Sequence, residues 1–285
     1  MSQTADTEFA SDRAVELRAA LVADLRAHRK IASEVVESAV RRVPRERYMP
    51  SDTDLAVAYG YDNSVVTRRN EHGVAISSVS AAYIQARMLE QAELTLGMTV
   101  LEVGSGGLNA AYLAEIVGAD GRVVSVDIDP EVTDRAATLL ERNGYGSQVR
   151  VMVADAEHGV PGEGPFDAII VTVGAWDIAP ALLDQLRDGG VIVLPLIMNA
   201  VTRTIGFRRQ GDHLVSTSVE VAGFVPLCRL RHNATYADLT VMPMGPTQKS
   251  RPAQEREAPG PSALRRRVSR ATRRRCQRRG IVVVG

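Results

Sequence analysis

Three acidic residues lie at the ends of short apolar runs that are typical of β-strands: Glu102, Asp127 and Asp155. A glycine-rich turn over residues 104–107 follows the first run and opens into a predicted helix that ends near residue 118. A strand, a glycine turn and a helix in this order point free backbone N–H groups at a ligand. Ligands of open α/β sheets sit at the carboxyl ends of the strands, which is where the three acids would stand.

The spacing of these residues favours a nucleoside ligand. Asp127 lies 23 residues after Gly104, where a carboxylate accepts hydrogen bonds from a ribose diol, and Asp155 stands where an adenine amino group would come. The dinucleotide fingerprint G-x-G-x-x-G is incomplete, because Asn109 occupies its sixth position. We therefore expect S-adenosylmethionine (AdoMet), which has no pyrophosphate. The alternative is that the glycines only form a tight turn and the acids are solvated strand ends.

The elements around this turn predict an α/β fold. Further strands are predicted over 122–126, 149–153, 166–173 and 191–196, and helices separate most of them. Several of these runs are apolar throughout, which fits a parallel sheet covered on both faces. Residues 201–227 instead alternate with a period of two around a turn at 210–212. We expect a Rossmann-like, doubly wound methyltransferase fold, with a mostly parallel sheet and an antiparallel C-terminal strand pair.

The region before the glycine turn predicts helices around a long loop. Apolar residues at helical spacing indicate helices over 12–28 and 32–42, and a third helix begins near Ser80, a candidate N-cap. Residues 51–79 are rich in Gly, Asp, Asn and Ser without clear periodicity. A loop of this length is usually functional or mobile, so we interpret it as a lid region.

Charge separates an acidic body from a basic tail. Residues 1–227 hold 20 basic and 31 acidic residues, whereas residues 228–285 hold 14 and 3. The tail is rich in Arg, Pro and Ala and has few core residues, a composition typical of disorder. The predicted organisation has three parts: N-terminal helices with the substrate and catalytic loop in 1–99, the AdoMet-binding core in 100–227, and a basic low-complexity tail in 228–285.

Composition excludes several protein classes. The longest apolar runs are too short to span a bilayer, and the N-terminus lacks the apolar region of a signal peptide. Both cysteines, Cys228 and Cys276, lie in the tail, which argues against a disulfide framework and against a cysteine metal site. We expect a cytoplasmic protein with no metal and no membrane partner. Its oligomeric state stays open.

Four segments together resemble the protein-L-isoaspartate O-methyltransferase family: "RRVPRERYMP", "VLEVGSGGLNAAYLA", "PFDAIIVTVGAWDIAPALLDQLRDGGVIVLPL" and "GFVPL". The resemblance covers roughly residues 15–227. It implies an AdoMet-dependent enzyme that methylates an isoaspartyl or aspartyl carboxylate in a protein or peptide substrate. The expected cofactor-binding residues are Glu102, Gly104, Ser105, Gly106, Asp127, Ile128, Asp155, Ala156 and Thr172.

The same resemblance implies a catalytic serine, for which two alignments are open. Matching the loop letters "AIS" selects Ser77, whereas counting back along the following helix from Met88 selects Ser80. We prefer Ser80, because helix spacing is harder to alter than loop length. The family's Gln-Pro pair is missing in either alignment. Asp62, in "AYGYDN", resembles a family position before the catalytic loop and is a candidate for the substrate cleft.

These departures favour a variant role. The "SSVSA" and "GSGGLNAA" segments are similar to FxLD-system methyltransferases, found with ribosomally made peptide clusters. That branch implies methylation of Asp in a precursor peptide, giving an aspartimide and then isoaspartate. A second class of function is a non-catalytic AdoMet-fold module whose Arg-rich tail binds nucleic acid, although the tail has almost no aromatic residues between its arginines. The resemblance ends at Leu227, and the following composition also resembles out-of-frame reading of a GC-rich gene, which sequencing around that codon would test.

Overall fold

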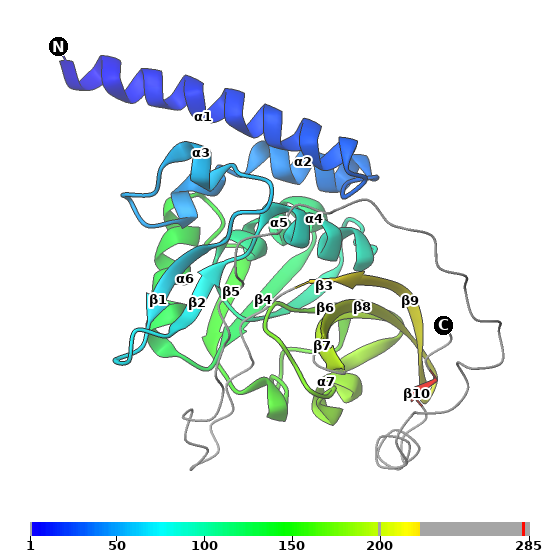
Figure 1. Ribbon diagram of the computed structural model, residues 1–285. Coiled ribbons are helices and arrows are strands. Elements are labelled where there is room, and N and C mark those ends of the chain that lie inside the picture. The colour runs from blue at the N-terminus through cyan, green and yellow to red at the C-terminus, as the bar shows by residue number, and fades with distance from the viewer. Residues whose placement is uncertain (1, 199–200, 223–280, 283–285) are drawn as a thin grey trace, which may run out of the picture.

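The computed structural model describes residues 2–198, 201–222 and 281–282. An eight-stranded sheet with the order β10-β9-β8-β7-β6-β3-β4-β5 forms the centre (Figure 1). Its strands are β3 (Thr99–Val103), β4 (Arg122–Asp127), β5 (Val149–Val153), β6 (Phe166–Val171), β7 (Leu186–Met198), β8 (Val201–Gln210), β9 (His213–Val221) and β10 (Ile281–Val282). Strands β3 to β7 pair in parallel, whereas β8 and β9 pair antiparallel. The predicted fold class, with its antiparallel C-terminal pair, is confirmed.

Neighbouring residues of the parallel strands face opposite sides of the sheet, and both sides are covered. Val123 belongs to one buried apolar cluster and Val124 to the other, and both are completely buried. Helices α4 (Ala82–Gln91), α5 (Leu108–Val117) and α6 (Pro130–Arg142) pack on the first side, and α7 (Pro180–Gln185) with the 3-10 turn η2 (Ala156–His158) packs on the second. Asp129 caps α6, because its carboxylate accepts a hydrogen bond from the Glu131 N–H and Pro130 is the first helical residue.

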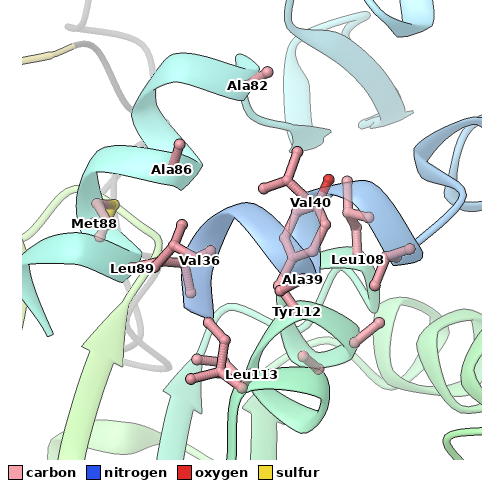
Figure 2. Packing of buried hydrophobic residues seen from close by; sticks show 14 of the residues in the cluster. Val36, Ala39, Val40, Ala82, Ala86, Met88, Leu89, Leu108, Tyr112 and Leu113 are labelled. Carbon is pink, nitrogen blue, oxygen red and sulfur yellow. The ribbon is translucent and has the colours of Figure 1, made fainter. Parts of the chain in front are cut away.

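The N-terminal helices join this first side rather than forming a core of their own. Helix α1 (Ser2–Ala27) lies on α2 (Glu34–Arg42), and the 3-10 turn η1 (Arg45–Tyr48) and α3 (Leu55–Ala58) follow them. Figure 2 shows Val36 and Val40 of α2 between Leu89 of α4 and Tyr112 of α5. One continuous apolar cluster therefore connects the N-terminal region to the sheet.

The interpretation of residues 51–79 as an irregular loop is wrong. They contain α3 and a separate antiparallel hairpin of β1 (Val65–Arg69) and β2 (Ala75–Val79). The Asn70 side chain accepts hydrogen bonds from two backbone N–H groups of the connecting turn, and Gly73 has φ +76°. The polar composition that suggested a loop therefore belongs to the hairpin turn and to strand residues that are mostly half-buried. Figure 1 shows the hairpin beside the central sheet.

The predicted tail, residues 228–285, lies outside the described residues except for Ile281 and Val282. These two form β10 and pair in parallel with Leu214 and Val215 of β9. Within the part of the chain that the structure describes, no helix is long and apolar enough to cross a membrane.

Candidate functional site

The glycine loop, residues 103–107, connects β3 to α5 in a conformation that depends on glycine. Gly104 has φ +102°, and a Cβ added there would lie 2.3 Å from Thr172 Oγ1. The Thr172 hydroxyl lies 2.9 Å from the Gly104 carbonyl oxygen and 3.1 Å from that of Val103, to which it donates. A Cβ on Gly106 would meet nothing within 4 Å. Thr172 therefore holds the loop from behind, while Gly106 faces open space through which a ligand can approach.

Glu102 and Ser105 lie behind the glycine loop. Both are completely buried, and the Ser125 hydroxyl bridges them, donating to Glu102 Oε2 and lying 2.8 Å from Ser105 Oγ. Burial raises the pKa of Glu102 to about 7, although hydrogen bonds from Ser125 and Asn109 lower it. The structure therefore places these two predicted cofactor residues under the loop and not on its open surface.

Asp127 ends β4 beside the loop and remains partly exposed. Its Oδ2 accepts from the Ser105 N–H at 3.1 Å, and its Oδ1 accepts from the Asp129 N–H at 3.0 Å. Burial raises the pKa of this carboxyl, and those backbone hydrogen bonds oppose the shift. Each carboxylate oxygen has a second lone pair, so Asp127 can still accept hydrogen bonds from a ligand diol. Ile128, the next residue, is also partly exposed.

A pocket opens past the ends of β3, β6 and β7, beside η2 and α7. Its lining is mostly apolar and includes Val103, Ala156, Val171, Trp176 and Leu194. Trp176 is 63% exposed, which is unusual for a side chain of this size. Asp155, the residue before Ala156, caps η2 by accepting from the Glu157 N–H at 3.0 Å, so its carboxylate is held by its own turn.

These features fit an adenosine group. Gly106 leaves space at the glycine loop, Asp127 presents a carboxylate beside this loop, and Ala156 lines the apolar pocket. A flat heterocycle needs apolar walls and a few fixed polar groups, and this arrangement provides both. Glu102 and Ser105 would act through the shape of the loop.

The serine segment, residues 77–85, runs from β2 into α4. Ser77 lies within β2, and its hydroxyl accepts from Thr67 Oγ1 at 2.8 Å. Ser80 lies between β2 and α4, is partly exposed, and its hydroxyl makes no hydrogen bond within the described residues. The N-cap of α4 is Ala81, so the interpretation of Ser80 as its capping residue is wrong. The free hydroxyl is consistent with Ser80 as the substrate-facing serine.

Asp62 lies in the segment before the hairpin. It is exposed, and no hydrogen bond to its carboxylate is formed by the described residues. The neighbouring Tyr61 carbonyl accepts from the Tyr83 N–H at 3.2 Å, which holds this segment against the first turn of α4. The structure therefore brings Asp62 to the same end of α4 as Ser80.

Two arginines near the serine segment were not expected. Arg45 is buried, and its guanidinium donates to the Ala58 carbonyl at 2.8 Å, to the Ser80 carbonyl at 2.5 Å and to Gln85 Oε1. Burial lowers the pKa of this guanidinium. The "VPRERYMP" segment contains Arg45 but gives no sign that its partners lie 13 to 40 residues away.

The second arginine, Arg68, connects the hairpin to the nucleoside side of the site. It lies opposite Ser77 in the hairpin and forms ion pairs with Asp129, which caps α6, and with Glu131. The pKa of the Asp129 carboxyl is lowered: burial raises it, but the hydrogen bond from Arg68 and other favourable contacts outweigh that effect. The Asp129 N–H in turn donates to Asp127, so one polar chain joins the hairpin to the predicted ribose-binding carboxylate.

Comparisons with known proteins agree with this geometry. The family model described as protein-L-isoaspartate(D-aspartate) O-methyltransferase matches residues 16–232. The protein-L-isoaspartate O-methyltransferase of Pyrobaculum neutrophilum is 37% identical over 209 residues, which cover 73% of this chain and 97% of that protein. The enzyme of the same name from Methanopyrus kandleri is 39% identical over 181 residues, covering 63% and 76%.

Solved structures show the same fold. One protein-L-isoaspartate O-methyltransferase superposes with a TM-score of 0.66 and 28% identity, covering 73% of this chain and 65% of that one. A Plasmodium falciparum structure, described as a putative member in complex with S-adenosyl-L-homocysteine, superposes with a TM-score of 0.62 at 18% identity and covers 73% and 97%.

Proposed function

The chain belongs to the protein-L-isoaspartate(D-aspartate) O-methyltransferase family, and from this membership we infer that it transfers a methyl group from AdoMet to the carboxylate of an isoaspartyl residue in a protein. The observation that carries this inference is that one family match, residues 16–232, spans both the glycine loop and the serine segment. The chain is accordingly a class I AdoMet-dependent methyltransferase.

The cofactor would be held by residues at the carboxyl ends of β3, β4 and β5. In our proposal the backbone of Gly104 and the open side of Gly106 accommodate the methionine part, and Asp127 with Ile128 holds the ribose. Asp155 and Ala156 flank the adenine, and Thr172 keeps the loop in place through its contact with Gly104. AdoMet supplies a methyl group activated by its sulfonium.

The chain's own contribution to the reaction is positioning. A carboxylate with a pKa of about 4 is already ionised at neutral pH, so the substrate is its own nucleophile and needs no general base. Ser80 donates its hydroxyl hydrogen to one carboxylate oxygen, which fixes the direction of the other. Asp62 contributes to the substrate cleft. Correct placement of two reactants can lower a barrier by roughly 7–11 kcal/mol.

A peptide-maturation role is the second candidate. The observation that favours it is the segment that leads to Ser80. It is a β1–β2 hairpin with its own turn, and it lacks the Gln-Pro pair that the repair family carries beside its catalytic serine. In this variant the substrate is Asp in a ribosomally made precursor peptide, and the methyl ester collapses to an aspartimide that opens to isoaspartate. The cytoplasmic location and the use of a protein or peptide partner are parts of the proposal.

Calorimetry followed by mass spectrometry tests the proposal. We expect AdoMet and S-adenosylhomocysteine to bind the full chain, and Asp127→Asn to weaken both about tenfold, because it replaces one charged acceptor oxygen for the ribose diol with a donor NH₂ group. We then expect an isoaspartyl peptide to gain the mass of one CH₂ unit. Absence of AdoMet binding would end the enzymatic proposal. Methylation of a precursor peptide without methylation of isoaspartyl peptides would favour maturation over repair.

A further inference from the structure

Arg45 has a buried positive charge without a negative partner. Its residue is 1% exposed, and its hydrogen-bond acceptors are the Ala58 carbonyl, the Ser80 carbonyl and the Gln85 side chain. Within the described part of the chain, no carboxylate forms an ion pair with this guanidinium. Tyr112 also faces it, and burial raises the pKa of that phenol, so the phenol is neutral at physiological pH.

Such an arrangement is costly for folding. A buried charge is usually paired with an opposite charge, since neutral hydrogen-bond acceptors compensate its lost hydration only in part. An arginine stays protonated even in this environment, because its intrinsic pKa is above 12. The glutamates of the same region have other partners, as Glu46 accepts from the Tyr59 hydroxyl and pairs with Arg18. The positive potential of Arg45 therefore remains uncompensated.

The open direction for this potential is the serine segment. One guanidinium N–H donates to the carbonyl of Ser80, whose own hydroxyl is free of hydrogen bonds to the described residues. Ser80 is partly exposed, whereas Arg45 is not. A carboxylate bound at the Ser80 hydroxyl would thus lie close to a cation that it does not touch.

We propose that Arg45 is a positioning residue that selects an anionic substrate: it fixes the Ser80 backbone, and its unpaired charge attracts the substrate carboxylate to the Ser80 hydroxyl. This inference rests on the proposed function, because it assumes that the carboxylate to be methylated binds at Ser80. The missing negative partner of Arg45 is then the substrate itself. A neutral amide of the same shape receives the same hydrogen bond from Ser80 but not the electrostatic attraction.

The substitution Gln85→Glu tests this inference without removing Arg45. The new carboxylate lies against the Arg45 nitrogen that now donates to Gln85 Oε1. It would compensate the charge of the guanidinium and keep the hydrogen bond. Two controls accompany it. Gln85→Met removes the hydrogen bond but leaves the charge, and Gln210→Glu adds the same charge at the exposed last residue of β8.

The readouts are the KM for an isoaspartyl peptide and the affinities, measured by calorimetry, for that peptide and for the neutral isoasparaginyl peptide. We expect Gln85→Glu to raise the KM about tenfold and to reduce the preference for the charged peptide by the same factor. Its melting temperature and AdoMet affinity should not fall. Gln210→Glu should match the wild type, and Gln85→Met should keep the preference for the charged peptide.

If Arg45 had only a structural role, the new ion pair in Gln85→Glu would leave the KM for the isoaspartyl peptide and the preference for the charged peptide unchanged. That result would overturn the inference while leaving the proposed function intact, since the wild type would still methylate the peptide. Wild-type protein that neither binds nor methylates an isoaspartyl peptide would instead overturn the proposed function. If Gln85→Glu fails to fold, the wild type alone decides: equal affinities for the two peptides would contradict an unpaired attracting charge.

Discussion

The glycine loop and the serine segment are built in opposite ways. The glycine loop is formed by consecutive residues between β3 and α5, and the Thr172 hydroxyl and the buried Glu102–Ser125–Ser105 group support it. The serine segment is held by the Arg45 guanidinium of η1, which donates hydrogen bonds to a carbonyl of α3, to the Ser80 carbonyl and to a side chain of α4. The first site is thus one continuous stretch of backbone with hydroxyl groups packed behind it, whereas the second is assembled from three separate elements around one guanidinium.

This difference separates two functions in space. A cofactor that is the same in every turnover suits a preformed, buried loop. A protein substrate requires a surface that can admit a chain, which suits partly exposed elements anchored from behind. Arg68 connects the two regions through its ion pairs with Asp129 and Glu131. Substitutions in the two regions should therefore separate cofactor affinity from substrate turnover.

The largest effect is expected for Gly104→Ala in the glycine loop. The φ of +102° and the 2.3 Å approach of the new Cβ to Thr172 Oγ1 should lower the free energy of unfolding by roughly 3 kcal/mol and abolish AdoMet binding. Gly106→Ala is the matched control, because its Cβ meets open space. It should unfold within about 0.5 kcal/mol of the wild type but bind AdoMet more weakly. Equal stability of the two variants in chemical denaturation would contradict the predicted strain.

Glu102→Gln should change how stability depends on pH. The folded protein holds the proton of Glu102 up to about pH 7, above the ordinary value of 4.5, so the wild type loses stability as pH rises between these values. The loss approaches about 3 kcal/mol above pH 7. Since glutamine has no such cost, the variant should be more stable than the wild type at pH 8 and similar below pH 4.5. The measurement is chemical denaturation of both proteins from pH 4 to 8. A constant difference in the free energy of unfolding between wild type and variant over this range would show that the pKa of Glu102 is not raised by folding.

Ser80→Ala and Ser77→Ala should separate the two candidate serines. Loss of the hydroxyl that orients the carboxylate should lower kcat by roughly 10- to 100-fold in Ser80→Ala, which corresponds to one good hydrogen bond to a charged group. AdoMet affinity should not change, because the serine segment lies outside the glycine loop. Ser77→Ala loses only the contact with Thr67 and should keep kcat within about threefold. Steady-state kinetics with the reverse order would assign the role to Ser77.

The smallest effect is expected for Arg68→Ala. Partly exposed ion pairs contribute about 1 kcal/mol or less, so the fold should remain stable while the hairpin opens more often. Hydrogen exchange of the β1–β2 amides should accelerate about fivefold. Arg69→Ala is the matched control, because among the described residues that guanidinium forms its one hydrogen bond with the Gly73 carbonyl inside the hairpin. Equal acceleration in both variants would mean that Arg68 does not connect the two regions.

The sequence predicted the parts of the molecule that depend on neighbouring residues. The parallel strands, the turn at 210–212 and the glycine loop all follow from local composition and spacing. The hairpin was missed because the polar residues in its strands and turn hide the apolar alternation typical of strands. Arg45 was missed because an arginine in a sequence is normally a surface residue, and only its distant partners reveal that it is buried.

The central claim is that the chain methylates isoaspartyl carboxylates, and it is tested most directly with two peptides that differ only in the Asp linkage. Purified full-length chain is incubated with AdoMet and either the isoaspartyl peptide or its normal aspartyl counterpart, and methyl ester is measured by mass spectrometry. We predict that the isoaspartyl peptide gains one CH₂ unit much faster than the aspartyl peptide. Equal absence of methyl ester on both peptides, with AdoMet bound to the protein, would contradict the account.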